Sequence, residues 1–247
     1  MRFTPFGFVG GQTLEIEYLI VGGGAPGESS NASDYAGYGG GAGGYRTGST
    51  SIDFGKSYPI VVGLGGLAGS ADYLLQSSSF NNLAVGGGYR LQSGPPQLNI
   101  NLEPDVICNG KKVKAGGGGA SATGSSAYCV GNEGKGGDGG NGLTWFDGNT
   151  YAGGGGAGTL SGDPSFAGVG GTGGGGRGAY GAVLPQQGTN GTGGGGGGGG
   201  YSTVPGNGGD GIVKIRYRGN QQILGGSITT TDGYTYHTFL SSSALYT

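Results

Sequence analysis

Two segments near opposite ends of the chain alternate apolar and polar residues, as half-buried β-strands do. In residues 14–21 the apolar side chains share one face and two glutamates lie on the other. In residues 212–217 the polar face carries Lys214 and Arg216. Opposite charges on matching faces favour neighbouring strands. We therefore expect these two segments to pair and to hold the middle of the chain between them.

Further strands are indicated by apolar or β-branched runs next to turn residues. Residues 58–62 form one, with Pro59 near its start, where a missing N–H costs least. Asn-Gly and Asp-Gly pairs favour tight hairpin turns, since both central residues of a type I′ turn need a positive φ. Such pairs occur at 109–110 between 106–108 and 111–113, at 147–148 between 145–146 and 149–151, and at 232–233 between 227–231 and 234–239. No stretch shows helical periodicity with caps, so we expect almost no α-helix.

Glycine dominates the middle of the chain: 70 of the 247 residues are glycine, gathered in clusters such as 39–44, 153–158 and 193–200. There is no Gly-X-Y period, which excludes collagen. Such runs can form extended helices with three residues per turn, but these helices have no internal hydrogen bonds. If they are buried, each N–H and C=O needs a partner in a neighbouring helix. We therefore expect parallel and antiparallel polyglycine helices packed side by side. The alternative is that the runs are flexible linkers, for which the 15 interleaved tyrosines would be unusual.

Charge and cysteine content narrow the class of protein. The net charge is −2, and the few basic residues are scattered, so we expect no nucleic-acid partner. No apolar run is long enough for a membrane span, and the first residues do not resemble a signal peptide. Cys108 and Cys129 are the two cysteines. For a protein made in a reducing cytosol, free thiols are favoured over a bridge, which stays open as the alternative.

Motifs typical of enzymes and of cofactor sites lack their structural context. The spacing of Gly22, Gly24 and Gly27 matches a dinucleotide fingerprint, but no helix is predicted to follow and receive the phosphates. Residues 136–143 resemble one calcium-binding repeat, which normally occurs in tandem. His237, the only histidine, lies within a predicted strand, and no nucleophile and acid accompany it as a catalytic triad would require. We expect no enzyme activity, no cofactor and no metal.

Several segments occur in a fixed order along the chain: 18–24, 39–48, 79–80 before 86–88, 151–158, 207–213 and 225–239. This order resembles the glycine-rich domain of tail-fibre and other virion proteins of phages, many of them marine and cyanobacterial. More distantly it is similar to the tip adhesins of T-even-type long tail fibres. The resemblance implies a mainly β and irregular fold, in which a polyglycine-II helix bundle is joined to a β-sandwich. It also implies a virion protein, made in the host cytoplasm without a signal peptide.

Three regions are expected along the chain. Residues 1–13 form an N-terminal attachment segment, residues 14–219 the glycine-rich domain with its helices held by strands, and residues 220–247 a C-terminal hairpin extension. The region 89–128 departs from the family pattern and is interpreted as an insertion, where a function particular to this chain would lie. The part of it around Asn109, with Lys111 and Lys112, is the alternative to the loops between glycine helices as the binding tip.

Exposed loops between the glycine helices are the expected binding residues, because the helices themselves present only backbone. The candidates are Tyr180, Leu184, Tyr201, Val204, Trp145 and Phe146. The expected function is host attachment as a tail-fibre or tip adhesin, with a host surface glycan or an outer-membrane protein as receptor and other virion proteins as partners. A homo-oligomer is compatible with this role. The alternative is a purely structural virion protein, such as a capsid decoration or a fibre joint.

Overall fold

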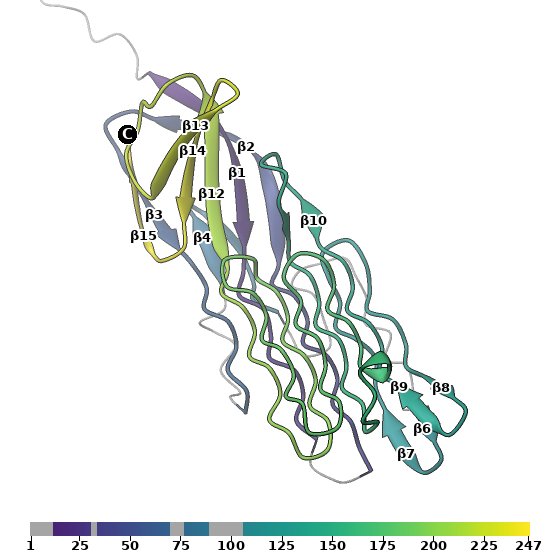
Figure 1. The fold of residues 1–247 in the computed structure, drawn as a ribbon. Helices are drawn as coiled ribbons and strands as arrows, with labels where there is room; N and C mark the ends of the chain where they lie inside the picture. Colours follow the sequence, from purple (N-terminus) through teal and green to yellow (C-terminus); the bar gives the residue numbers. More distant parts are fainter. Residues whose placement is uncertain (1–11, 31–33, 70–76, 89–105) are drawn as a thin grey trace, which may run out of the picture.

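A β-sandwich and a long bundle of extended glycine-rich segments make up the molecule (Figure 1). The computed structural model describes residues 12–30, 34–69, 77–88 and 106–247. The expected N-terminal attachment segment falls outside the described residues except for its last two positions. Of the expected insertion, residues 89–105 also lie outside them.

The larger sheet of the sandwich joins strands from both ends of the chain. Its strands β1 (Thr13–Val21) and β12 (Ile212–Arg218) are antiparallel neighbours, as expected from their charges, and Glu17 faces Arg216 in the register. Arg216 Nε donates to Glu17 Oε2 at 2.7 Å. The order is β13 (Ser227–Thr231), β14 (Tyr234–Phe239), β12 (Ile212–Arg218), β1 (Thr13–Val21) and β2 (Tyr45–Asp53).

The smaller sheet covers one face of the larger one. Its inward side chains, among them Ile60, Phe80 and Leu245, form one core with Ile16 and Ile215 of the larger sheet. Each of these five side chains is almost fully buried. The apolar residues that alternate along the strands are therefore the ones that face the other sheet. The order is β15 (Ser243–Tyr246), β3 (Ser57–Val61), β4 (Ser78–Phe80) and β5 (Leu83–Val85).

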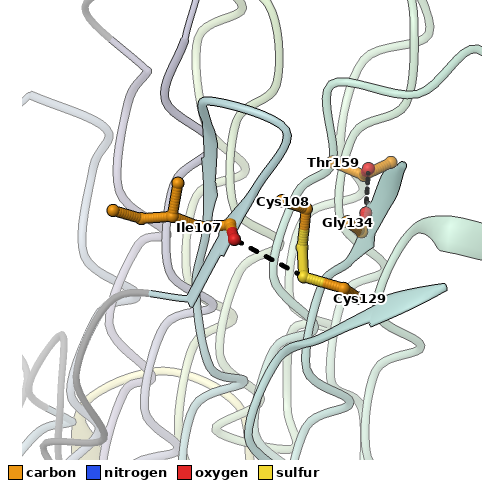
Figure 2. Close-up of a disulfide and its surroundings, with 5 residues drawn as sticks. All are labelled: Ile107, Cys108, Cys129, Gly134 and Thr159. Atoms are coloured by element: carbon orange, nitrogen blue, oxygen red, sulfur yellow. Dashed lines mark hydrogen bonds between the residues drawn. A yellow bond between two sulfur atoms is a disulfide. The ribbon is translucent and has the colours of Figure 1, made fainter. Parts of the chain in front are cut away.

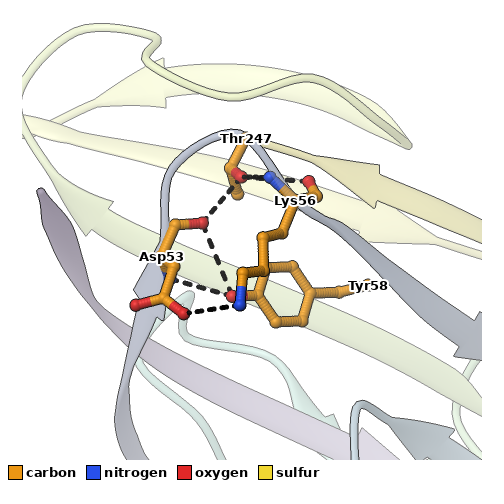
Figure 3. Close-up of polar contacts among 4 residues, drawn as sticks. All are labelled: Asp53, Lys56, Tyr58 and Thr247. Atoms are coloured by element: carbon orange, nitrogen blue, oxygen red, sulfur yellow. Dashed lines mark hydrogen bonds and ion pairs between the residues drawn. The ribbon is translucent and has the colours of Figure 1, made fainter. Parts of the chain in front are cut away.

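The last residue of the chain closes this sheet against the turn between β2 and β3 (Figure 3). The Thr247 hydroxyl donates to the Asp53 carbonyl at 2.8 Å and accepts from the Lys56 N–H at 2.9 Å. The Asp53 N–H in turn donates to the Tyr58 hydroxyl at 2.8 Å. The contacts of Thr247 with Asp53 and Lys56 join segments that are 194 and 191 positions apart in the sequence.

Two of the three expected hairpin turns have the expected geometry, and the third differs. Asn109-Gly110 and Asp232-Gly233 have positive φ at both residues, as a type I′ turn requires. At Asp147-Gly148 only the glycine does. There the Gly148 N–H donates to the Trp145 carbonyl at 3.0 Å. The first paired strand lies two residues before the expected 145–146, and the second is one residue shorter than the expected 149–151. They are β10 (Leu143–Thr144) and β11 (Thr150–Tyr151).

The glycine runs form the expected bundle, and residues 193–200 are its central helix. All eight residues are buried. The N–H groups of Gly195 and Gly198 donate to carbonyls of segment 153–158 at 2.9 Å, so bonds to the same neighbour recur every third residue. This is the period of a polyglycine helix, whose hydrogen bonds all go sideways. Hydrogen bonds connect the central helix to segments 22–28, 37–43, 153–158, 174–179, 186–189 and 206–210.

The spacing between these helices leaves no room for side chains. A Cβ on Gly195 would lie 2.0 Å from the Gly40 carbonyl oxygen, and one on Gly155 2.0 Å from that of Gly196. Neighbouring helices run in both directions. Segment 174–179 is parallel to the central helix and segment 37–43 antiparallel, as the order of their bonds shows. The runs are therefore packed structure, and the interpretation of them as linkers is wrong.

Two small hairpins at the far end of the bundle are joined by a disulfide (Figure 2). Cys108 of β6 (Val106–Cys108) and Cys129 of β8 (Tyr128–Val130) are bridged, so the expectation of free thiols is wrong. The physical reason is that the two hairpins lie side by side, with the Cα atoms 5.6 Å apart. The expectation of free thiols was based on the reducing cytosol, which says nothing about the distance between the two cysteines. The other strands of the hairpins are β7 (Lys111–Val113) and β9 (Glu133–Lys135).

Helical structure is almost absent, as expected. Within the described ranges, the one helical element is a short 3-10 turn, η2 (Pro164–Phe166). None of the helices in this part of the chain is long and apolar enough to cross a membrane.

Candidate attachment surfaces

The bundle has one end at the sandwich and one end remote from it, which we call the distal end (Figure 1). At its start the central helix meets the sandwich, where the Gly193 N–H donates to the Asp210 carbonyl just before β12. At its other end Gly200 enters a turn, and Ser202 N–H reaches Ser30 Oγ at 3.4 Å. Segments 180–185 and 201–205 are therefore both distal turns.

Four of the six expected binding residues lie in these two turns. Leu184, Tyr201 and Val204 expose 64%, 57% and 67% of their surface, although Gly200 and Gly206, which flank the second turn, are buried. The Tyr180 ring is half-buried beneath the Arg177 guanidinium, whose central carbon lies 4.5 Å from the ring centre. The structure therefore brings these four side chains to one end of the molecule.

Local hydrogen bonds hold the distal turns in shape. Tyr201 and Ser202 both adopt positive φ, which non-glycine residues rarely do. The Thr203 hydroxyl accepts from the Gly200 N–H at 2.8 Å, while the Thr203 N–H donates to the Gly200 carbonyl at 2.8 Å. Because these two hydrogen bonds hold the turn, Tyr201 loses little conformational entropy when it binds a partner.

The disulfide-linked hairpins, one of which contains the alternative tip around Asn109, add apolar residues that were not among the expected binding residues. Ile107, Tyr128 and Val130 are all about half exposed or more. The Thr159 hydroxyl donates to the Gly134 carbonyl of the second hairpin at 2.8 Å (Figure 2). Two residues further on, the Ser161 carbonyl accepts from the Gly181 N–H of a distal turn at 2.7 Å, so the hairpins and this turn are joined by one short segment. A detectable signal was present only at Asn109-Gly110, which marked the first hairpin. The second has a lone positive-φ glycine, Gly131, among many glycines.

The other two expected residues, Trp145 and Phe146, lie against the outer face of the larger sheet and far from the distal turns. Trp145 is only 5% exposed, and its indole N–H donates to Thr47 Oγ1 at 3.1 Å. Phe146 is 56% exposed, and the Arg216 guanidinium covers its ring at 3.6 Å. Trp145 is thus a packing residue, whereas Phe146 remains accessible.

An ionic network fixes the loop that carries these two aromatic residues. Lys214 of β12 forms an ion pair with Asp147, and the Tyr151 hydroxyl donates to Asp147 Oδ2 at 2.7 Å. Burial by itself would raise the pKa of Asp147, but the hydrogen bonds from Lys214, Tyr151 and Asn149 outweigh it and lower that pKa. Burial, together with the bond to Asp147, raises the pKa of Tyr151. Asp147 is therefore held as a carboxylate and Tyr151 as a neutral phenol.

The motifs that imitate a nucleotide or metal site are part of the bundle. Gly24 and Gly27 donate to carbonyls of segment 206–210 at 2.9 and 3.0 Å, so their N–H groups have partners within the fold. In the part of the chain that the structure describes, no three His, Cys, Asp or Glu side chains gather as metal ligands would.

A polyglycine-helix bundle closed by a β-sandwich, with apolar turns at its distal end, defines the class of the protein. The model of the glycine-rich domain family matches residues 8–218, and the chain belongs to that family. No curated protein and no solved structure matches the chain.

Proposed function

We propose that the chain is a phage virion protein that attaches to the host cell surface through its distal end, as a tail-fibre or tip adhesin. The observation that carries the proposal is the set of exposed apolar side chains on the distal turns. Contiguous exposed apolar residues on a rigid support are typical of interaction sites. A receptor on the host, either a surface glycan or an outer-membrane protein, is the partner that this end would meet.

The rigidity of the bundle supports the same role. Each distal turn begins and ends in helices that are bonded to several neighbours, so its side chains are held before a partner arrives. Preorganisation lowers the entropy lost on binding and so raises affinity. The disulfide between Cys108 and Cys129 adds a cross-link at this end, and such bonds persist in oxidising surroundings outside the cell.

Cell adsorption by turn variants tests the proposal. A variant with Tyr180→Ser, Leu184→Ser, Tyr201→Asn and Val204→Ser removes the apolar surface, while asparagine tolerates the positive φ at position 201. We expect binding of the labelled protein to host cells to fall at least tenfold, with the melting temperature nearly unchanged. A companion variant changes Ile107, Tyr128 and Val130 to serine. Comparison of the two variants shows whether receptor binding depends on the distal turns or on the hairpins.

A matched control changes exposed apolar residues of the sandwich, Val61, Leu224 and Leu240, to serine. These side chains have similar exposure but lie away from the distal end. Normal adsorption by both distal variants would refute the proposal. If the control instead prevents incorporation into particles, while adsorption by the distal variants stays normal, a purely structural virion role is the better description.

A further inference from the structure

A pocket of about 200 Å³ lies on the outer face of the larger sheet, at the opposite end of the molecule from the distal turns. One wall is the loop between β10 and β11, with Phe146 and Asn149. The rest of the lining comes from β12, β14 and β13, including Thr238, Thr229 and the turn residue Asp232. Three strands and a separate hairpin thus line a partly open site that distal attachment does not use.

The apolar part of the pocket is an aromatic ring held in place. Phe146 is more than half exposed, yet the Arg216 guanidinium lies 3.6 Å from its ring centre and Trp145 lies against it at 5.7 Å between centres. Arg216 is itself fixed by Glu17 and by the Tyr234 ring on β14. An exposed phenyl ring normally turns freely. The contacts with Arg216 and Trp145 restrict this ring, which lies beside the polar groups of the pocket.

The polar part of the pocket is rich in hydroxyl, amide and carboxylate groups. Asp147 is neutralised by Lys214 and held by Tyr151, so Lys214 does not stand as an isolated positive charge. Asp232 accepts from the Thr231 hydroxyl at 3.3 Å and keeps lone pairs for a ligand. The lining therefore carries two carboxylates against one ammonium group, which disfavours phosphate, sulfate or carboxylate ligands.

We propose that this pocket binds one sugar unit of an uncharged glycan, with the Phe146 ring against the apolar face of the sugar. Asp232 and Asn149 would accept and donate hydrogen bonds to its hydroxyl groups, since carboxylate and amide groups satisfy vicinal hydroxyls well. The pocket is smaller than the roughly 300–1,000 Å³ that larger ligands occupy, which suits a single ring. The molecule thus carries a saccharide site on its sandwich in addition to the distal attachment surface.

Saturation-transfer NMR on the full chain tests the site. The probes are the methyl glycosides of glucose, galactose, mannose and N-acetylglucosamine, with N-acetylneuraminic acid and inorganic phosphate as charged counterparts. We expect at least one uncharged glycoside to receive saturation. Asp232→Asn should weaken its binding about tenfold or more, because loss of a hydrogen bond to a charged group has that effect. Phe146→Ala should weaken it by a similar factor, because the apolar face of the sugar loses the ring that covers it.

Controls separate folding from recognition and this site from the distal one. Asp232→Asn keeps a residue that tolerates the positive φ of the turn, so its melting temperature should match that of the wild type. Leu184→Ser, at the distal end, should leave glycoside binding unchanged. The proposal is overturned if no uncharged glycoside binds at millimolar concentration, if only the charged probes bind, or if neither pocket variant weakens binding. Because no host cell is involved, each of these results is independent of distal attachment.

Discussion

At the scale of single residues, glycine is required by its missing side chain as much as by its backbone freedom. A Cβ on Gly196 would lie 2.1 Å from the Gly206 carbonyl oxygen, well inside van der Waals contact. The Gly196 N–H also donates to the Ala25 carbonyl at 2.9 Å. Any side chain must therefore push two helices apart and leave buried backbone groups without partners. Buried alanines such as Ala25 show that the rule is positional, because their methyl groups find space.

Gly196→Ala is therefore expected to destabilise the protein severely, although alanine normally stabilises a chain relative to glycine. Each orphaned buried group costs about 1–3 kcal/mol, and more than one is affected. Chemical denaturation measures the change. The matched control is Gly162→Ala, at which a Cβ meets nothing within 4 Å. Similar unfolding midpoints for the two variants would contradict the close packing of the helices.

His237 is a buried titratable group of the sandwich, and its neighbours set its protonation state. Its Nδ1 lies 2.7 Å from the Gly225 carbonyl and must carry the proton, so Nε2 accepts from the Tyr217 hydroxyl at 3.1 Å. Burial lowers the pKa of His237, opposed in part by the bond to Gly225. The folded protein thus keeps the ring neutral, whereas the unfolded chain binds a proton below its usual pKa of 6.5.

Stability should consequently fall as the pH drops from about 6.5 toward the lowered pKa of the folded state. Above pH 6.5 both states are neutral at this position, and the contribution of His237 is fully present. The slope approaches about 1.4 kcal/mol per pH unit within the window. His237→Asn, which can still donate to Gly225, should lose this slope. The measurement is urea denaturation of the wild type and of His237→Asn at pH 7.5, 6.5 and 5.5. If the free energy of unfolding falls equally with pH in both proteins, His237 is not the cause.

At the scale of elements, hairpins were predictable where both turn residues need a positive φ. Asn109-Gly110 and Asp232-Gly233 set their turns from local preference alone. The strand β2 was not predicted, because its segment is rich in serine and threonine and buries one apolar residue, Ile52. It lies at the edge of the sheet, and only its pairing with β1 defines it. Packing, rather than propensity, makes this segment a strand.

Reduction of the disulfide is expected to destabilise the distal hairpins. Cys108 and Cys129 are 21 positions apart, and closing a loop of that size stabilises a fold by about 3 kcal/mol. The chain has no other cysteine, so a reductant acts on this bond alone. The measurement is denaturation of the oxidised and reduced protein, after a thiol count of each. Two free thiols in the untreated protein, or equal midpoints, would contradict the assignment.

At the scale of the whole molecule, stability comes from sideways hydrogen bonds among segments that are remote in sequence. The central helix, residues 193–200, has no internal hydrogen-bonding pattern and no side chains to bury. Its neighbours come from both halves of the chain, including segments 22–28 and 206–210. Opening it would require parting several helices at once. The bundle should therefore behave as one cooperative unit.

Hydrogen exchange gives a sharp prediction for this unit. Amides of residues 193–200 should be among the slowest in the protein, although a run of eight glycines in isolation would be among the fastest. Native-state exchange followed by mass spectrometry measures this, with the exposed turn 201–204 as an internal reference. Exchange of the glycine run on the same timescale as the turn would mean that the bundle opens locally.

The sequence by itself determined the mainly β class, the pairing of the two end strands and the need for packed glycine helices. Each of these follows from local periodicity, charge or the lack of a Cβ. Tertiary structure alone decided which glycine run lies beside which, because the runs are nearly interchangeable as sequence. It also decided that Cys108 meets Cys129, and that Phe146 lies at the opposite end from Leu184 and Tyr201. These are contacts across space, and no local preference of the chain encodes them.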